Sequence, residues 1–396
     1  MFRDLAKYVV SAAALVVIAP LTLMAEDLKL ITGVTLKEEI SDNILMSSSF
    51  RKSDFITTVT PFLDFSGADE RGELKVSSGV NFLDYARNST LNALDYFVQS
   101  GLDFRIDPRL SVSAGSGYVR DSRHDHAEPG TGLLSKTGSN RQNYRLSGDY
   151  LLTERSSTNF SYAYSQETFS DSLYLNTSVH TVNIAQAYDL ESSPRKERIT
   201  GVLGYSHYGT GTTLVENYSG SVGVENKFNE LWGFVLSAGG RYTRSEFDVA
   251  TTSSVPVYSA TSYGNGLIGS LSINYADEST TAGLSFNHDI VSASGNSGAT
   301  QRTSISTNLN EKITSDFSGN LGFGYFKYKS DQNQFSSRAF SQDDLVVTAG
   351  LRYNFTDDLF LEGDYRYNYS SSQSMPHTSQ NLFMLRLTVR QDIMRL

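Results

Sequence analysis

The chain of 396 residues contains no cysteine, a single tryptophan and only seven prolines. The absence of cysteine excludes disulfide frameworks, thiolate metal sites and cysteine nucleophiles. After residue 25, no stretch approaches the roughly 18–20 consecutive apolar residues that a membrane-spanning helix needs. Acidic residues outnumber basic ones by 43 to 33, so nucleic acid is not expected as a partner, because phosphate binding requires clustered Lys and Arg.

The first 25 residues have the pattern of an export signal. A short charged start, Met1 to Lys7, precedes an apolar run from Tyr8 to Met24, and the run ends at Ala25. This order of regions is typical of a secretory signal peptide, although Leu23 stands where a small residue is usual. We predict a signal peptide over residues 1–25, with an uncleaved inner-membrane anchor as the alternative.

From residue 28 onward, the sequence alternates apolar with polar or small side chains in segments of about ten residues. Leu74, Val76 and Phe82 share one parity, whereas Lys75 and Ser77 share the other. A period of two indicates β-strands, because successive side chains along a strand point to opposite faces.

The connections between these segments alternate in length. One set is tight and rich in Asp, Asn, Ser, Gly and Pro, as at 107–109, 193–196 and 356–358, whereas the other set is mostly longer, as at 121–141 and 370–380. Short turns on one side and long loops on the other are typical of outer-membrane barrels. Counting the tight turns predicts about eighteen antiparallel strands, with sixteen as the alternative.

A soluble secreted β-sandwich would also show alternation, but three features favour a barrel. The polar face of the strands suits a wet lumen better than a dry core, the last strand runs to the C-terminal end, and aromatic residues stand at many strand ends, as they do at membrane interfaces. These aromatic residues are Tyr85, Tyr118, Tyr150, Tyr164, Tyr188, Tyr205, Phe228, Tyr275, Tyr325, Phe355 and Tyr369. We therefore predict an all-β, up-and-down transmembrane barrel over residues 26–396, in the outer membrane of a Gram-negative bacterium.

Strand parity predicts which charged residues face the lumen. They are Glu73, Lys75, Asp95, Asp103, Arg105, Arg145, Asp149, Glu225, Lys227, Arg241, Arg352, Glu362, Asp364, Arg366, Arg386 and Arg390. Both signs are mixed, whereas a strongly ion-selective pore shows rings of one sign. Two interpretations stay open: the charges pair across neighbouring strands, or Arg352, Arg366, Arg386 and Arg390 face an anionic solute.

The longest loop, 121–141, is either a constriction that folds into the lumen or a surface loop. Its His124 and His126 give no defined metal site, because two histidines in a loop need further partners to form a tetrahedron. No Ser–His or Asp–His constellation stands out, so we predict a protein that is not an enzyme and has no metal or cofactor.

Two segments carry a resemblance to a known family. They are Glu38-Glu-Ile-Ser-Asp-Asn-Ile-Leu45 and Ser53-Asp-Phe-Ile-Thr-Thr-Val-Thr-Pro61. They resemble the porin 2 family of outer-membrane barrels, which includes barrels encoded with exopolysaccharide export clusters. The matching residues are Asp42, Asn43, Ile44, Ser53, Asp54, Phe55, Ile56 and Pro61.

The resemblance implies a passive pore for export of an extracellular polysaccharide. The expected partners are outer-membrane lipids, the polysaccharide chain in the lumen, and a periplasmic Wza-like export protein that docks on the short turns. A general diffusion porin for small solutes has much the same lumen and stays open as an alternative. A structural or interaction barrel, such as a cytochrome sheath or an adhesin anchor, is a third hypothesis.

Overall fold

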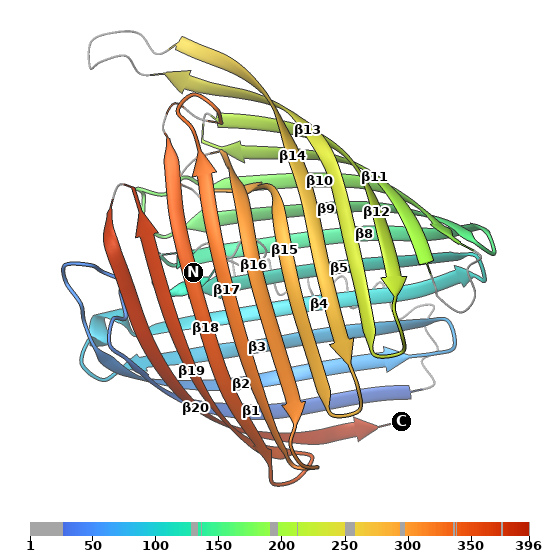
Figure 1. Cartoon of the computed structure of the whole chain (residues 1–396). Coiled ribbons are helices and arrows are strands. Elements are labelled where there is room, and N and C mark those ends of the chain that lie inside the picture. The colour runs from blue at the N-terminus through green and yellow to red at the C-terminus, as the bar shows by residue number, and fades with distance from the viewer. Residues whose placement is uncertain are drawn as a thin grey trace, which may run out of the picture.

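A single antiparallel sheet of 18 strands forms the molecule and closes on itself. The computed structural model describes residues 27–127, 134–135, 137–190, 197–211, 213–249, 258–293, 298–335, 337, 339–373 and 375–395. The sheet closes because β1 (Asp27–Ser41) pairs with β2 (Asp54–Ala68) on one side and with β20 (Met375–Arg395) on the other. The blue β1 therefore lies beside the red end of β20 (Figure 1). The predicted eighteen-stranded barrel is confirmed; the predicted signal peptide, 1–25, lies outside the described residues.

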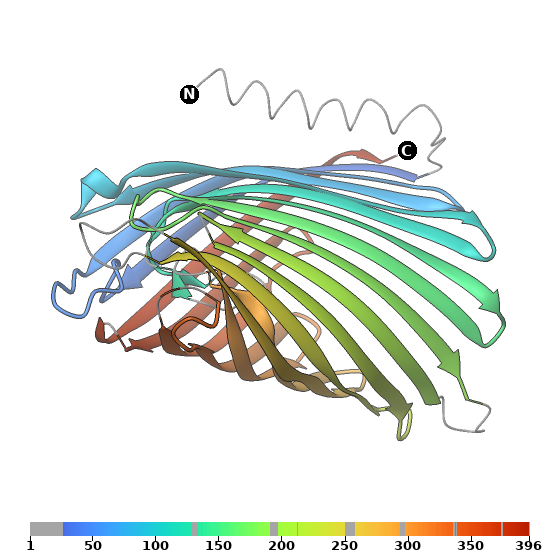
Figure 2. The ribbon, with the colours of Figure 1, turned by 90° about the horizontal axis from the view of Figure 1, so that it is seen from above.

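The remaining strands follow one another around the wall in chain order. They are β3 (Gly72–Tyr85), β4 (Ala93–Asp107), β5 (Leu110–Asp121), β8 (Ser139–Thr153), β9 (Ser156–Phe169), β10 (Thr177–Asp189), β11 (Glu197–Thr210), β12 (Thr213–Lys227), β13 (Trp232–Val249), β14 (Tyr258–Ala276), β15 (Thr280–Ser292), β16 (Ala299–Lys312), β17 (Phe317–Ser330), β18 (Phe340–Asn354) and β19 (Leu359–Ser372). A small hairpin, β6 (His126–Ala127) with β7 (Leu134–Ser135), lies in the connection after β5, and the 3-10 helix η2 (Ser89–Leu91) precedes β4. The turned view shows the strands running around one interior (Figure 2). No helix among the described residues is long and apolar enough to cross a membrane.

The tight turns at one rim owe their shape to Asp, Asn and Thr side chains. In the turn between β2 and β3, Oδ1 of Asp69 accepts hydrogen bonds from the backbone N–H groups of Arg71 and Gly72, at 2.7 and 2.6 Å. The same arrangement recurs at Asp107, Thr153, Asn229, Asp277, Thr314 and Thr356. Such bonds replace the backbone partners that a turn lacks. The turn predicted at 193–196 lies outside the described residues.

The opposite rim carries most of the longer connections, with one clear correction. The predicted loop 370–380 is wrong, because β19 continues to Ser372 and β20 begins at Met375. The ladder reaches this far because Ser370 pairs with Thr378 and Tyr369 with Ser379. Hydroxyl residues are compatible with both a loop and a strand, so composition alone did not separate the two.

The outer face of the wall carries an apolar band between aromatic residues. Trp232 and Tyr275 lie 4.8 Å apart, ring centre to ring centre, near one end of β13 and β14, and Tyr242 stacks on Tyr263 at 6.2 Å toward the other end. Only a closed sheet satisfies all its backbone groups in lipid, and an apolar band between aromatic girdles is the outer surface of outer-membrane barrels. The barrel therefore belongs in a bacterial outer membrane.

One residue predicted for an aromatic girdle lies inside instead. Tyr85 is only 6% exposed and packs with Ile44, Ile56 and Leu83. The register explains the correction, because Tyr85 pairs with the inward-facing Ile56 at the end of β3. This cluster is one of the small apolar cores that lie within the barrel toward the rim of longer loops.

Candidate channel lumen

The interior face follows from the pairing registers, because residues opposite one another on neighbouring strands share a face. Starting from the buried Glu39 on β1, the registers place all sixteen predicted lumen residues on the inward side of the wall. Most of them have a polar or charged partner close by, as at Glu73, Asp103 and Asp149. Contact between these residues and a solute stays a prediction.

A group of arginines lies on β18, β19 and β20, next to the place where the barrel closes. The carboxylate of Glu362 accepts a hydrogen bond from Arg386 at 3.3 Å and lies 3.6 Å from the guanidinium of Arg352. One carboxylate therefore pairs with two guanidinium groups. The guanidinium of Arg352 also lies 3.8 Å from the ring centre of Phe360, which is a cation–π contact. Asp364 has the same inward parity on β19 as Glu362, so this part of the wall carries carboxylates as well as guanidinium groups.

Two further arginines complete this group, which we call the arginine wall: Arg352, Arg366, Arg386 and Arg390. Arg390 donates to the carbonyl oxygen of Asp357 at 2.6 and 3.1 Å and lies 3.6 Å from the carboxylate of Asp358. Nε of Arg366 is buried without a hydrogen-bond partner among the described residues. The four arginines that the sequence singled out thus come from three adjacent strands and lie on one side of the lumen.

Other predicted lumen charges have local partners, either within one strand or across two neighbouring strands. Lys75 lies 2.8 Å from Glu73, and both side chains are largely exposed. Asn159 donates to Asp149 at 2.8 Å across β8 and β9. Exposed pairs of this kind contribute roughly 0–1 kcal/mol, because water screens them. Pairing across neighbouring strands therefore describes part of the wall, and contact of the arginines with an anionic solute stays a prediction.

Residues 122–125, which follow β5 in the connection to β8, enter the barrel, and Arg123 holds them at its wall. The guanidinium donates to both oxygens of Glu39 on β1, at 2.9 and 2.7 Å, and to both oxygens of Asp125, at 2.9 and 3.0 Å. Lys37 adds a second cation 2.8 Å from Glu39. We call these four residues the loop latch. Bidentate pairs between Arg and carboxylates are among the strongest hydrogen-bonded contacts in proteins.

Gln380 on β20 joins the loop latch to the closing strands. Its side-chain amide donates to Asp125 at 2.6 Å, to Ser41 at 2.9 Å and to the carbonyl oxygen of Asn43 at 3.1 Å. Gln380 and Ser41 are fully buried. The strands β1 and β20 thus share one buried polar network with the connection that follows β5. Such a network holds a unique arrangement only when its donors and acceptors have hydrogen-bond partners.

The electrostatics of Arg123 favour a permanently charged latch. Burial alone would lower the pKa of Arg123, but the carboxylates of Asp125 and Glu39 outweigh burial and raise this pKa well above its ordinary value. The sequence predicted either a constriction or a surface loop for residues 121–141. The inward-folded residues of this loop support the constriction. Its tip, Gly130–Gly132, lies outside the described residues.

A second connection also contributes an interior residue, on another side of the barrel. Phe335, between β17 and β18, is 1% exposed and packs with Tyr208 of β11 and Val215 of β12. The guanidinium of Arg241 on β13 lies 5.7 Å from its ring centre. Described residues of both connections therefore occupy the interior and narrow the lumen toward the loop rim.

The sequence-based prediction did not include most of the residues that narrow the lumen. Lys37 and Glu39 have the inward parity of the first strand. Strand parity in the sequence could therefore have predicted that both side chains face the lumen. Arg123, Asp125 and Phe335 lie in connections, where no periodicity indicates which way a side chain points. Only the three-dimensional contacts reveal them.

The residues of the two resemblance segments have structural roles beside the latch. Asp54 accepts hydrogen bonds from the backbone N–H groups of Phe55, Arg87 and Asn88, at 2.8–2.9 Å. The side-chain amide of Asn43 donates to the carbonyl oxygens of Ser47 and Ser379, both at 2.9 Å. These residues fix the loops of the rim at the closing strands.

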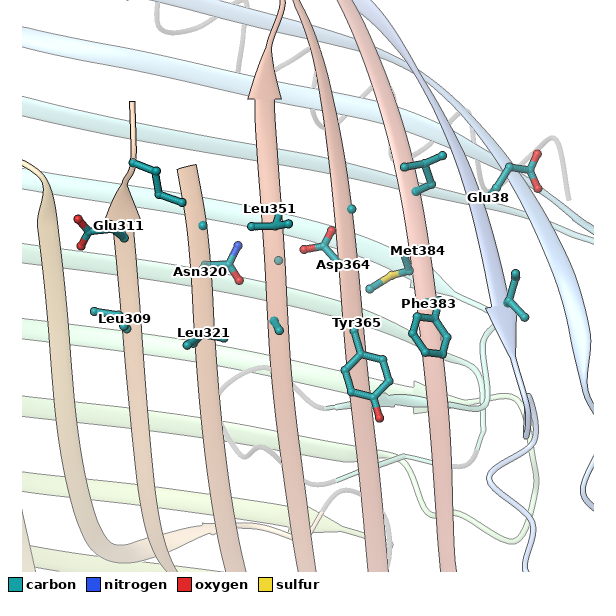
Figure 3. A pocket seen from close by; sticks show the side chains of 17 residues that line it. Glu38, Leu309, Glu311, Asn320, Leu321, Leu351, Asp364, Tyr365, Phe383 and Met384 are labelled. Atoms are coloured by element: carbon teal, nitrogen blue, oxygen red, sulfur yellow. The ribbon is translucent and has the colours of Figure 1, made fainter. Parts of the chain in front are cut away.

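An apolar depression on the described surface lies outside the lumen. It measures about 830 Å³ and lies on the outer face of β16 to β20 and β1. Leu309, Leu321, Leu351, Tyr365 and Phe383 line it across neighbouring strands (Figure 3). Its apolar lining faces acyl chains, and the strands separate it from the polar interior.

The fold and the interior define an outer-membrane β-barrel with a polar, loop-narrowed lumen. No family model matches the chain, and no curated protein matches it.

Three similar solved structures are distant from this chain in sequence. The outer membrane protein OpdK from Pseudomonas aeruginosa is 9% identical, with 91% of this chain and 99% of that chain covered and a TM-score of 0.46. OccK2 (OpdF) from the same organism, solved in complex with glucuronate, is 8% identical, with 93% and 99% covered and a TM-score of 0.47. The ferric citrate transporter FecA is 10% identical, with 87% of this chain but only 60% of that chain covered and a TM-score of 0.47. The fold therefore rests on the strand pairing itself.

Proposed function

We propose that the protein is a passive outer-membrane channel through which an extracellular polysaccharide leaves the cell. The observation that carries this proposal is the composition of the inward face: hydroxyl and amide side chains with the arginine wall along one side. Hydroxyl and amide groups exchange hydrogen bonds with sugar hydroxyls without forming a tight site. Arginine side chains suit acidic sugars, because a guanidinium binds a carboxylate in two parallel hydrogen bonds.

The resemblance to the porin 2 family supports the same cargo. It rests on the segments 38–45 and 53–61, whose residues Asn43 and Asp54 build the loop rim around the latch. In this proposal the loop latch is the resting state of the channel. A polymer must displace the loop after β5, so binding at the arginine wall and release of Arg123 are successive steps.

The energy for transport comes from outside the barrel in this proposal. The short turns held by Asp69, Asp107 and Asp277 are the surface on which a periplasmic Wza-like export protein would dock, and lipids of the outer membrane surround the wall. Mutating exposed residues of these turns, while keeping the capping aspartates, tests the docking surface without unfolding the turns.

Deleting the gene and measuring surface polysaccharide tests the cargo. The proposal predicts a loss of matrix that the wild-type gene restores and that a gene with Arg352, Arg386 and Arg390 changed to Gln restores only in part. Unchanged matrix in the deletion strain would contradict export. Open conductance in a bilayer without a partner, combined with unchanged matrix, would indicate a general diffusion porin instead.

A further inference from the structure

The wall contains a seam where two neighbouring strands separate. β14 pairs with β13 along its length, from Tyr258 opposite Val249 to Tyr275 opposite Trp232. With β15, however, it pairs only from Gly269 to Ala276. β15 itself stays paired with β16 as far as Ser292. Above Gly269, the facing edges of β14 and β15 therefore form no ladder with each other.

The separation lies in the outer half of the membrane band. On β14, Tyr275 and Tyr263 belong to the aromatic pairs that mark the two ends of this band. Gly269 lies midway between them in sequence, and a strand has a constant rise per residue. The ladder thus closes the wall in the half nearer the tight turns and ends where the outer leaflet begins.

The upper end of β15 is held away from β14 by contacts across the interior. The hydroxyl of Tyr208 on β11 donates to the carbonyl oxygen of Ile290 at 3.2 Å. Ile290 is buried with Tyr208, Val215 and Phe335, and Val291 packs on Tyr328. Backbone groups at membrane depth need partners. Here one carbonyl of the separated edge has a side-chain partner, so the separation is part of the fold.

On the lumen side, the space beside the seam is open at Gly264 and covered at Gly266 by the side chain of Arg241, whereas the membrane side is apolar. Gly264 has the inward parity of β14, and a β-carbon built there would have no atom within 4 Å. Leu267 has the outward parity and is 76% exposed. On the lumen side of β15, Asp289 forms an ion pair with Arg302 at 2.6 Å. At the seam, the polar lumen and the apolar membrane are therefore separated only by the thickness of a single strand.

We propose that the seam between β14 and β15 is a lateral portal that joins the lumen to the outer leaflet and admits the acyl chain of an amphipathic molecule. The polar part of such a molecule stays among the hydroxyl and charged groups of the lumen. Its acyl chain passes between the strands above Gly269. The portal proposal depends on the barrel geometry alone, so its test does not depend on whether the channel exports a polysaccharide.

Fluorescence quenching in vesicles tests the portal, and the absence of native cysteine makes the labelling specific. Ile268→Cys carries a bimane label on the lumen side of the separated edge. Ser272→Cys is its matched control, because it lies on the same face of the same strand but in the paired stretch, opposite Ser285. Leu267→Cys is the lipid-facing reference. The vesicles contain phosphatidylcholine with a nitroxide in the middle of one acyl chain.

The portal predicts that the label at 268 is quenched at least half as strongly as the label at 267, whereas the label at 272 is quenched several-fold less. Equal weak quenching at 268 and 272 would overturn the proposal.

A disulfide experiment gives an independent answer if a labelled variant fails to fold. Continuing the observed register would place Gly266 opposite Val291, but the strands are separated there. The double variant Gly266→Cys/Val291→Cys is therefore expected to cross-link slowly under oxidation. Ser272→Cys/Ser285→Cys, in the paired stretch of the same two strands, is expected to cross-link readily. Rapid and complete cross-linking of both pairs would show a closed wall and overturn the portal.

Discussion

Two seams of the wall differ in how completely their strands pair. The seam between β1 and β20 joins strands that are far apart in the chain and is paired along its length, whereas the seam between β14 and β15 joins consecutive strands and is paired only in part. β1 and β20 come from the two ends of the chain, yet they pair from Lys29 opposite Arg395 to Ser41 opposite Leu382, with one register shift. β14 and β15 belong to one hairpin, yet they pair over only half of β14. Adjacency in sequence therefore does not decide where this wall is complete.

The difference has a physical reason. Joining the two chain ends closes a loop of several hundred residues, and the entropic cost of closure rises with loop length. The closing seam carries extra contacts, because the loop latch and Gln380 tie β1 and β20 to the connection after β5. A hairpin needs no such reinforcement, since its turn holds the strands together even where the ladder is missing.

The largest expected effect comes from removing Arg123, the cation of the latch that contacts both Glu39 and Asp125. Arg123→Ala leaves Glu39 and Asp125 buried beside the closing seam, and breaking a buried pair in this way costs about 3–5 kcal/mol. The free energy of unfolding in urea, measured in lipid vesicles, checks this value. Arg51→Ala is the control, because Arg51 pairs with Asp42 at the exposed rim, where about 0–1 kcal/mol is expected. Equal effects of the two changes would contradict the latch.

Charged residues on the outer face compare the two seams directly. Leu387→Arg, on β20 at the closing seam, is expected to destabilise the barrel by about 2–4 kcal/mol if it lies near the membrane midplane. Leu267→Arg, beside the separated edge of β14, is expected to cost less, because a guanidinium there reaches the polar interior through the gap. Unfolding of both variants in vesicles measures the difference. A larger loss for Leu267→Arg would argue against an open seam.

A smaller effect is expected on ion selectivity at the closing seam. Glu362→Gln frees Arg352 and Arg386 of their shared carboxylate, so the anion-to-cation permeability ratio is expected to rise roughly twofold. Asp289→Asn, near the other seam, frees only Arg302 and is expected to change the ratio less. Reversal potentials in planar bilayers under a salt gradient measure both. No change with Glu362→Gln would show that the arginine wall does not face the permeating ions.

The smallest effect concerns the turn that holds the β14–β15 hairpin. Hydrogen bonds from the Tyr275 hydroxyl and from the backbone N–H groups of Thr280 and Ser279 lower the pKa of Asp277 to about 2. A lowered pKa stabilises the folded state above the ordinary pKa of aspartate, and this contribution disappears as the pH falls toward 2. Asp277→Asn is therefore expected to lower the melting temperature slightly at pH 7 and not at pH 2. An equal loss at both pH values would contradict the role of the charge.

The wall was predictable from the sequence because its rules are local. Alternation set the faces of the strands, and turn residues such as Asp107 and Thr356 set the hairpins, so the strand number and the inward position of Arg386 both followed. Tyr85 was assigned to the wrong face because an aromatic residue at a strand end is compatible with a girdle and with a buried cluster. The loop predicted over 370–380 failed because serines are common in both loops and strands.

The narrowed end of the lumen was not predictable in the same way. Arg123 and Phe335 lie in connections, and their positions depend on partners that are distant in sequence, such as Glu39 and Val215. The separation of β14 from β15 also leaves no local signal, since both segments alternate normally. It results from contacts that Ile290 makes across the interior, which only the folded barrel provides.

Single-channel recording of the purified protein in planar bilayers shows whether the barrel encloses a lumen narrowed by a latched loop. We expect small current steps for the wild-type protein and larger steps for Arg123→Ala, whereas Arg51→Ala keeps the wild-type step size. Absence of current from both the wild-type protein and Arg123→Ala, in barrels that are shown to be folded, would contradict a lumen of this kind.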